Sequence, residues 1–193
     1  QDTPTSAVSS DKLARLFVMG EKRVAILALN LLGFNDLLTL DKSIPRAQKI
    51  HEISAQLLTI VVAAAQQERG VMDSFHGDHF ILTFNASRAV AGALAAAVRT
   101  AGAVSDAVRH DALFKGSLGV SAGAASGKTH VGTLGIDGYR RLSVVGHAYR
   151  SAVGLQGVCA QFMRRTATRK SGGVSAGCVV DELALKEISN CGM

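Results

Sequence analysis

The sequence predicts an α+β domain with a ferredoxin-like βαββαβ core, extended by a ribbon, a helix and a terminal strand. Three observations predict this fold. Short apolar runs with strand character alternate with longer stretches of helical period, a Gly-Asp turn joins two short runs as a hairpin, and no internal repeat or low-complexity linker interrupts the order. The 193 residues suffice for one ordinary domain. We expect it over residues 21–190, after a leader or linker over residues 1–20.

The first half of the pattern contains a strand, a helix and a hairpin. Residues 24–29 form a continuous aliphatic run, which is typical of a strand covered on both faces. Pro45 marks a helix start, because proline costs nothing in a first helical turn, and apolar residues at helical spacing continue to about residue 70. Residues 71–75 and 79–84 then flank the turn at 76–78 and predict two short antiparallel strands.

The second half adds a helix to the core and then extends it. Asn85 or Ser87 can cap a helix that runs to about residue 107 with a face of small side chains. The remaining expected elements are, in chain order, a strand at 118–122, a glycine-rich ribbon at 122–138, a strand at 142–145, a helix at 148–159, a strand at 174–180 and a helix at 181–188.

Composition limits the cellular setting. Apolar residues make up 48% of the chain, yet the longest apolar runs fall short of the ~20 residues of a membrane helix, so we expect no direct membrane contact from this segment. The three cysteines lie far apart without a Cys-x-x-Cys pair, which indicates a reducing compartment. Because the chain starts at Gln1 rather than Met, we expect a cytoplasmic domain of a longer protein, whose membrane tether could lie elsewhere.

The positive charge is local. The net charge is +6, and four basic residues lie in one seven-residue stretch: Arg164, Arg165, Arg169 and Lys170. A nucleic-acid surface usually pairs basic residues with exposed aromatic side chains, whereas aromatic residues are only 5% of this chain and Trp is absent. This stretch is therefore interpreted as a solvated loop, and no nucleic-acid partner is expected.

Residues 122–129 match a loose phosphate-loop pattern, with Gly-Lys-Thr at 127–129. Such a loop needs a helix after it, because the helix N-terminus supplies much of the field that holds a phosphate. Residues 130–138 instead carry three glycines among branched residues, which favours a hairpin. A glycine-rich turn is therefore the preferred interpretation of this stretch.

The residues His76, Asp78 and His79 offer imidazole and carboxylate groups that suit zinc or manganese. Strand alternation would send Asp78 and His79 to opposite sides, so a turn with one useful carboxylate is favoured over a metal cluster. Cys178, in an apolar strand, and Cys159, on the apolar side of a helix, are expected to be small core residues.

Three segments in order resemble the catalytic domain of class III adenylyl/guanylyl cyclases. Residues 30–34, Asn-Leu-Leu-Gly-Phe, are similar to Asp-Ile-x-Gly-Phe of that family, and residues 75–78, Phe-His-Gly-Asp, to its Ile-Gly-Asp hairpin. Residues 142–152, Leu-Ser-Val-Val-Gly-His-Ala-Tyr-Arg-Ser-Ala, resemble its Tyr-Thr-Val-Ile-Gly-Asp-Ala-Val-Asn-Leu-Ala. The resemblance extends over residues 22–188. It implies a head-to-tail pair of domains that holds a nucleotide and two Mg²⁺ or Mn²⁺ ions at the interface.

Most of the family's functional positions are substituted here. The resemblance places the two metal-binding aspartates at Asn30 and Asp78, so that only the second is kept. It places the purine-reading lysine at Ser74 and the Asp or Thr that also reads the purine at Ser143. The ribose-orienting Asn and the phosphate-stabilising Arg fall on Arg150 and Gly154. Only Arg150 is a candidate for a catalytic cation, one helical turn from its usual place.

The resemblance therefore leaves the enzymatic status open between two hypotheses. The favoured one is a cyclase-homology domain that has lost nucleotide cyclisation and serves as a dimerisation or regulatory module in intracellular cyclic-nucleotide or related signalling. The alternative is a divergent cyclase that converts ATP or GTP to the cyclic monophosphate with Mg²⁺ or Mn²⁺, alone or beside a partner domain.

Both hypotheses imply a homodimer or a heterodimer with another cyclase-type domain, with the hairpin at residues 74–78 and the ribbon after Gly132 in the interface. A smaller alternative is a pocket that binds a nucleotide or another anion without turnover, through Arg141, Arg150 or Lys128.

Overall fold

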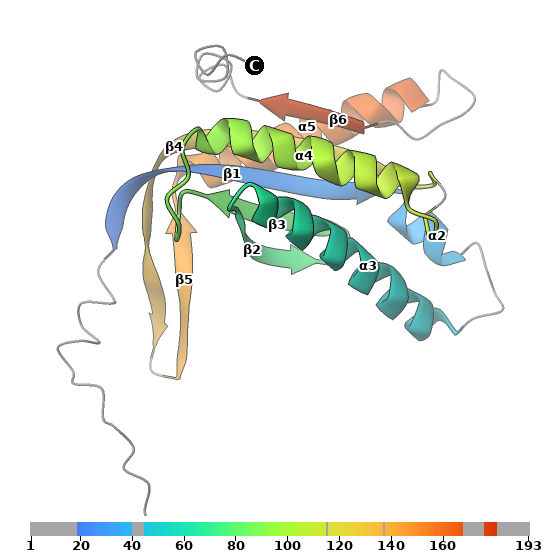
Figure 1. Ribbon diagram of the computed structural model, residues 1–193, viewed down its shortest axis with the longest axis horizontal. Helices are drawn as coiled ribbons and strands as arrows, with labels where there is room; N and C mark the ends of the chain where they lie inside the picture. Colours follow the sequence, from blue (N-terminus) through green and yellow to red (C-terminus); the bar gives the residue numbers. More distant parts are fainter. Residues whose placement is uncertain (1–18, 40–44, 115, 137, 168–175, 181–193) are drawn as a thin grey trace, which may run out of the picture.

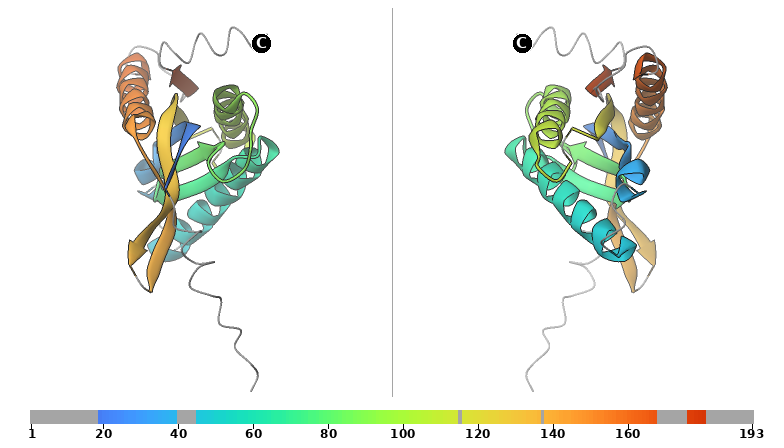
Figure 2. Two further views of the ribbon diagram at one scale, coloured as in Figure 1. Left: turned by 90° about the vertical axis from the view of Figure 1, so that its left-hand side faces the viewer. Right: turned by 90° about the vertical axis from the view of Figure 1, so that its right-hand side faces the viewer.

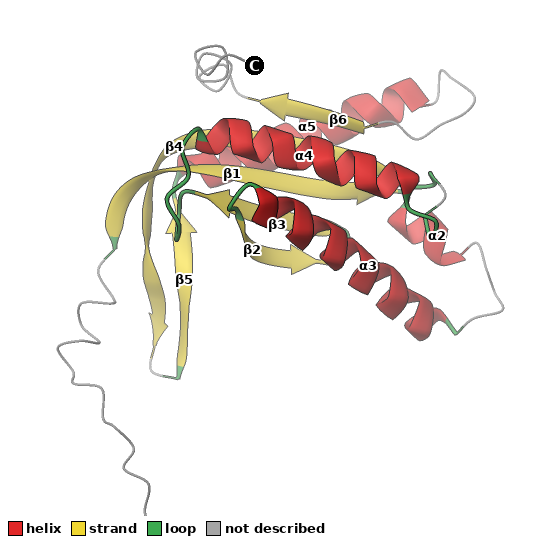
Figure 3. Ribbon diagram, in the orientation of Figure 1, coloured by secondary structure: helices red, strands yellow, loops and turns green. Residues whose placement is uncertain are grey.

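The computed structural model describes residues 19–39, 45–114, 116–136, 138–167 and 176–180. These residues form a sheet with helices on both faces (Figures 1 and 3). The strands are β1 (Gly20–Leu32), β2 (Val71–His76), β3 (His79–Phe84), β4 (Gly119–Ile136), β5 (Tyr139–Val145) and β6 (Ala176–Val180). The helices are α2 (Phe34–Thr39), α3 (Arg46–Gln67), α4 (Ala93–His110) and α5 (His147–Ala167).

The described strands form one sheet in the order β2-β3-β1-β4-β5, and β6 pairs with β4 off this path. Neighbouring strands are antiparallel except for β4 and β6, which are parallel. The order of β1, α3, β2, β3, α4 and β4 along the chain, with β1 between β3 and β4, is the predicted ferredoxin-like core. The predicted fold class is therefore confirmed.

Strand β1 is buried on both faces because helices cover both sides of the sheet (Figure 2). Alternate side chains of a strand point to opposite faces. One set packs in the larger core with α3 and α4, namely Ala25, Leu27, Leu29 and Leu31. The other set packs with Ala148 and Ala152 of α5, namely Val24, Ile26 and Ala28. This explains the continuous aliphatic run at residues 24–29.

Strand β4 is one long strand, and residues 122–129 lie inside it. The phosphate-loop interpretation and the preferred glycine-rich turn are therefore both wrong. The reason is that β4 pairs with β1 without interruption from Gly119 to Val131, which satisfies the backbone groups that a loop would leave open. Glycine at 123 has a packing role instead, because a Cβ there would overlap Ala152 O and Gln156 N of α5.

The start of helix α4 differs from the predicted one, because the predicted capping residue Asn85 makes other hydrogen bonds. Asn85 does not cap α4, and neither does Ser87, because α4 begins at Ala93 after Gly92, whose φ is 59°. Asn85 closes the preceding turn: its Nδ2 donates to Arg23 O at 2.9 Å, and Val90 N donates to its Oδ1 at 3.1 Å. Helix α2, which follows β1 directly, is an element that the sequence pattern did not predict.

Helix α5 continues past the predicted end at Cys159 as far as Ala167. Arg164 and Arg165 therefore belong to its last turn, where positive charge complements the helix dipole, and not to a loop. Arg169 and Lys170, the leader over residues 1–18 and the helix predicted at 181–188 lie outside the described residues.

One of the two predictions for cysteine is confirmed. Cys159 is 3% exposed, and burial raises the pKa of its thiol, which keeps it protonated at neutral pH. Cys178 is exposed, so its assignment to the core is wrong; it lines a small cavity with Ala101 and Gly102 of α4 instead of filling the core. Within the described ranges, no helix is long and apolar enough to cross a membrane.

The contact between α5 and β4 predicts the effect of Gly123→Ala. The added methyl group would overlap the α5 backbone, so we expect a loss of about 1–3 kcal/mol in the free energy of unfolding. Gly127→Ala, on the same strand, is the matched control, because its Cβ would meet only Ala148 Cβ at an ordinary 3.6 Å. Urea unfolding of both variants measures the difference, and equal midpoints would contradict the proposed close packing.

Candidate functional site

Two cavities lie at opposite ends of helix α5. The hairpin cavity, of about 590 Å³, lies between the end of β1, the β2–β3 turn and the C-terminal half of α5; it is lined by residues that include Asn30, Asp78, His79, Gln156 and Arg164. The ribbon cavity, of about 530 Å³, lies between β5, Asp73 and the start of α5; its lining includes Arg141, Ser143, His147, Tyr149 and Arg150. At 1.5 Å per residue, His147 and Arg164 are about 25 Å apart along α5.

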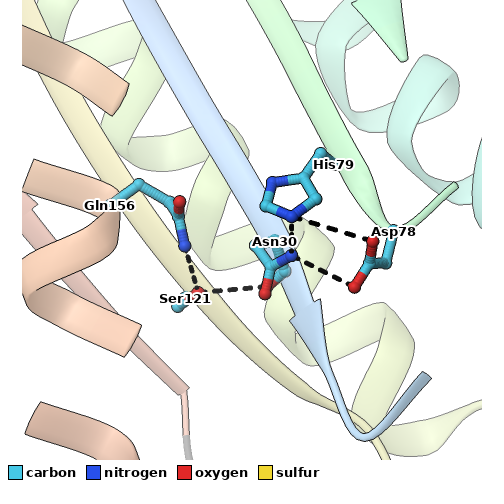
Figure 4. A network of polar contacts seen from close by, with 5 residues as sticks. All are labelled: Asn30, Asp78, His79, Ser121 and Gln156. Atoms are coloured by element: carbon cyan, nitrogen blue, oxygen red, sulfur yellow. Dashed lines mark hydrogen bonds and ion pairs between the residues drawn. The ribbon is translucent and has the colours of Figure 1, made fainter. Parts of the chain in front are cut away.

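The hairpin cavity contains a polar cluster of Asn30, Asp78 and His79 (Figure 4). Asn30 stands near the end of β1, and Asp78 and His79 follow the glycine of the β2–β3 turn. Leu31 N donates to Asp78 O at 3.0 Å, which holds the turn against the end of β1. The antiparallel register places Asn30 opposite His79. Backbone pairing therefore brings these side chains together.

The amide nitrogen of Asn30 makes both contacts within this cluster. Its Nδ2 donates to Asp78 Oδ2 at 3.2 Å and lies 2.7 Å from Nε2 of His79. A carboxylate can only accept hydrogen bonds, so the nitrogen of the amide, and not its oxygen, must face Asp78. The contact with His79 then requires an unprotonated Nε2 as acceptor. Asn30 is only 5% exposed, which leaves this arrangement little freedom.

Two further residues connect this cluster to α5. Ser121 Oγ donates to Asn30 O at 3.2 Å, and Gln156 Nε2 donates to Ser121 Oγ at 2.8 Å (Figure 4). All three residues are buried, at 5%, 0% and 7% exposure for Asn30, Ser121 and Gln156. A buried polar chain with satisfied hydrogen bonds resists rearrangement. Sequence reasoning missed Ser121 and Gln156, because neither lies in a recognisable motif.

The residues of the hairpin cavity do not fit two hard divalent cations. Such ions take oxygen ligands, preferably carboxylates, and a pair of them needs more than one carboxylate. Here Asp78 supplies the carboxylate of the cluster, and the Asn30 nitrogen already donates to it. The other carboxylate that lines the cavity, Asp36, is exposed on α2 and lies outside the cluster. Among the described residues, no group of three or more His, Cys, Asp or Glu side chains is placed to hold a metal ion.

The prediction that Asp78 and His79 point to opposite sides is wrong. His79 Nε2 lies 3.8 Å from Asp78 Oδ1, and both groups meet at Asn30. Strand alternation does not apply, because Asp78 belongs to the turn and only His79 begins strand β3. His79 is therefore a member of the site that the sequence pattern missed.

The ribbon cavity contains Ser143 and Arg150, two of the residues singled out by the resemblance. It also contains an ion pair between strands at opposite ends of the sheet order. Arg141 on β5 lies 3.2 Å from Asp73 Oδ2 on β2. The register of β2 against β3 skips at Asp73, between Met72 and Ser74, and such a bulge redirects a side chain. The curled sheet then lets Asp73 reach the ribbon.

The remaining predicted residues lie outside both cavities or offer no functional group. Ser74 lies on β2, next to Asp73, and lines neither cavity. Gly154 is exposed on α5, one turn after Arg150. Lys128 lies on β4 and forms an ion pair with Glu21 at 3.1 Å, away from Arg141 and Arg150. Among the three cationic candidates for an anion pocket, the structure therefore brings together two.

No family model and no curated protein sequence matches this chain. Solved structures match its fold. The adenylyl cyclase CyaB from P. aeruginosa superposes with a TM-score of 0.71 at 16% identity, over 90% of this chain and 83% of that one. The guanylate cyclase domain of RhGC from Catenaria anguillulae, in complex with GTP, gives 0.68 at 15% identity, over 88% and 84%.

A third match is the non-canonical dimeric guanylyl cyclase domain of the RhoGC fusion protein from the aquatic fungus Blastocladiella emersonii, with a TM-score of 0.69 at 15% identity, over 89% of this chain and 86% of that one. The chain thus has the fold of class III adenylyl/guanylyl cyclase catalytic domains, as its sequence resemblance predicted.

The Asn30 cluster predicts a metal response for Asn30→Asp. Two carboxylates would then lie at the present 3.2 Å contact. In EDTA, their repulsion should lower the free energy of unfolding by at least ~1 kcal/mol, which corresponds to about 2–4 °C in Tm. Mn²⁺ should restore that loss by ligating both carboxylates. Thermal unfolding with EDTA and with Mn²⁺ measures both effects.

Asn35→Asp is the control for this variant, because Asn35 lines the same cavity but is exposed. We expect it to show little response to Mn²⁺, as we expect of the unsubstituted chain. If the unsubstituted chain were stabilised by Mn²⁺ as strongly as Asn30→Asp, the conclusion that Asn30 excludes metal ions would be wrong.

Proposed function

We propose that this cyclase-homology domain does not cyclise nucleotides and serves as a dimerisation or regulatory module. The observation that carries the proposal is the contact between the Asn30 amide nitrogen and the Asp78 carboxylate. The resemblance requires two carboxylates at these places to hold two cations, which activate the ribose hydroxyl and polarise the phosphates. A hydrogen-bond donor on the remaining carboxylate opposes that use.

The absence of an arginine at 154 supports the same proposal. A cation at this position would stabilise charge on the phosphate in the transition state, and such stabilisation is a major part of the catalysis of phosphoryl transfer. Gly154 has no side chain, and apart from its own helical turn no described atom lies within 4 Å of where its Cβ would be. Arg150 lies one turn away, at the ribbon cavity and not beside Asp78.

We further propose a head-to-tail pair, formed with a second copy or with another cyclase-type domain. The two cavities use separate stretches of α5, residues 147–150 and residues 156–164, so they are distinct sites within one chain. A two-fold axis would bring the hairpin cavity of one domain against the ribbon cavity of the other. Large apolar side chains are exposed on the hairpin and the ribbon: Phe75, Leu134, Tyr139, Leu142 and Val145. Exposed apolar groups of this size mark interaction surfaces.

The free thiols of Cys159 and Cys178 fit a reducing, cytoplasmic setting. In that setting we expect the domain to act in intracellular signalling through the partner it pairs with. Its nucleotide, if it retains one, and any Mg²⁺ or Mn²⁺ would have to be held largely by that partner.

The alternative of a divergent active cyclase draws on the one retained carboxylate. The resemblance assigns a metal ligand to Asp78, and Asp78 lines a cavity that is large enough for a ligand. That alternative requires the Asn30 amide to turn, so that its oxygen joins Asp78 in holding an ion.

An activity assay separates these functions. We expect purified protein with ATP or GTP and Mg²⁺ or Mn²⁺ to form no cyclic AMP or cyclic GMP above the background without protein. Asn30→Asp alone should remain inactive, because Gly154 and Ser74 are unchanged. Product formation that is abolished by Asp78→Ala would overturn the proposal in favour of the divergent enzyme.

The dimer proposal predicts the effect of Leu142→Glu. Leu142 on β5 is 46% exposed on the proposed interface, and a charge there should weaken self-association by tenfold or more. Leu113→Glu is the matched control, because Leu113 is 43% exposed just after α4, away from the ribbon. Sedimentation across a concentration series measures the effect. A chain that stays monomeric at high concentration would refute self-pairing and leave the heterodimer.

A further inference from the structure

We propose that the hairpin cavity binds a small aliphatic diamine in its doubly protonated form, without a metal ion. This inference goes beyond the proposed function and rests on it in one respect, because it takes the cavity to be free of divalent cations. Three features of the cavity carry it: an amide oxygen of Gln156 that has no donor, an oxygen of Asp78 that has no hydrogen bond, and a second carboxylate at Asp36.

The neighbours of Gln156 fix the orientation of its amide. Ser121 Oγ has one proton, which it donates to Asn30 O at 3.2 Å. Ser121 Oγ can therefore only accept from Gln156, so the amide nitrogen, and not the oxygen, must face it at 2.8 Å. Gln156 Oε1 consequently points away from Ser121 (Figure 4).

This oxygen is an acceptor that no described protein group uses. Gln156 is only 7% exposed, yet no donor in the described part of the chain reaches its Oε1. Every fully enclosed side-chain oxygen or nitrogen of the described residues has a hydrogen-bond partner, so Oε1 borders open space. Gln156 lines the hairpin cavity. A largely buried acceptor without a partner favours a ligand that brings an N–H or O–H donor.

Asp78 offers a second acceptor to the same ligand. Its Oδ2 accepts from Asn30, whereas its Oδ1 lies 3.8 Å from His79 Nε2, which is too far for a hydrogen bond. The Asp78 side chain is 28% exposed, so Oδ1 is accessible. The imidazole of His79 adds no positive charge here, because its Nε2 is the acceptor for Asn30. The carboxylate therefore keeps its negative charge and one oxygen for a cationic donor.

The other charged side chains that line the cavity are Asp36 and Arg164. Asp36 is exposed on α2, and no described residue forms an ion pair with it. Arg164 is exposed in the last turn of α5. Apolar side chains, among them Leu32 and Phe34, line the cavity as well. Two carboxylates on separate elements thus outnumber one guanidinium, which suits a ligand with two positive groups on an apolar chain.

An ammonium group fits these acceptors better than a divalent cation does. A divalent cation requires several oxygens around one point at about 2.0–2.6 Å. An ammonium group has three N–H donors, each of which needs one acceptor at hydrogen-bond distance. Aliphatic amines keep this proton at neutral pH, as lysine does with a pKa of about 10.4. In the proposed complex one ammonium group donates to Gln156 and Asp78, and the other pairs with Asp36.

Calorimetric titration of the whole chain with 1,4-diaminobutane, in EDTA at low salt and neutral pH, tests the proposal. The fully N-methylated dication of the same chain length is the reference probe, because it has the same charge but no N–H donor. We expect saturable binding of the diamine that is at least tenfold tighter than binding of the methylated dication, because charge-assisted hydrogen bonds supply the difference.

Charge variants make the test directional. Asp78→Asn should weaken diamine binding by tenfold or more. Asp106→Asn is the matched control: it makes the same change of charge on an exposed side chain of α4 outside the cavity, so affinity should stay unchanged. Arg164→Gln removes a like charge from the cavity and should tighten binding several-fold, an effect that a merely structural role would not produce.

The amide oxygen is tested by Gln156→Met, which removes the acceptor but keeps a side chain of similar length. We expect it to weaken diamine binding several-fold. Gln161→Met is the matched control, because Gln161 lines the same cavity but is exposed, so we expect little change. Thermal unfolding without ligand checks that each variant folds.

The outcomes that overturn the proposal differ from those that overturn the loss of cyclase activity. Absence of diamine binding in EDTA, equal affinity for the methylated dication, equal loss in Asp78→Asn and Asp106→Asn, or weaker binding in Arg164→Gln would refute it. Formation of a cyclic product would contradict the proposed function alone, because the titration contains neither a divalent cation nor a nucleotide.

Discussion

The packing of helix α5 directly on the backbone of strand β4 is the constraint on which the rest of the molecule depends. At Gly123 there is no room for a side chain between strand and helix, so the position of α5 is set by backbone contact. Because α5 forms one wall of each cavity, the same contact determines where that wall lies in both. Through Gln156 and Ser121, it also extends to Asn30.

The amide at residue 30, where the resemblance places a carboxylate, has consequences beyond a missing charge. An aspartate would repel Asp78 and require a cation between them, whereas the amide nitrogen donates a hydrogen bond to Asp78 and needs no ion. The cluster is therefore satisfied by protein groups alone. Its burial and its connection to α5 make it a structural element of the fold.

Charge is divided unevenly between the cavities. Two carboxylates, Asp36 and Asp78, line the hairpin cavity together with Arg164, while two arginines over a covered carboxylate line the ribbon cavity. In a head-to-tail pair these surfaces would face each other.

The sequence by itself determined the order of the strands and helices of the ferredoxin-like core, the double burial of residues 24–29 and the place of Asp78, because these follow from local periodicity and from turn residues. The tertiary structure decided what depends on strand register and on the curl of the sheet. It brought His79 and Asp78 together at Asn30, joined Asp73 to Arg141 across strands that end the sheet order, and made residues 122–129 part of one long strand. It also left Cys178 exposed, since the fate of an edge strand depends on what packs over it. Periodicity reports which face of an element is covered, but it carries no information about which distant side chain completes a contact.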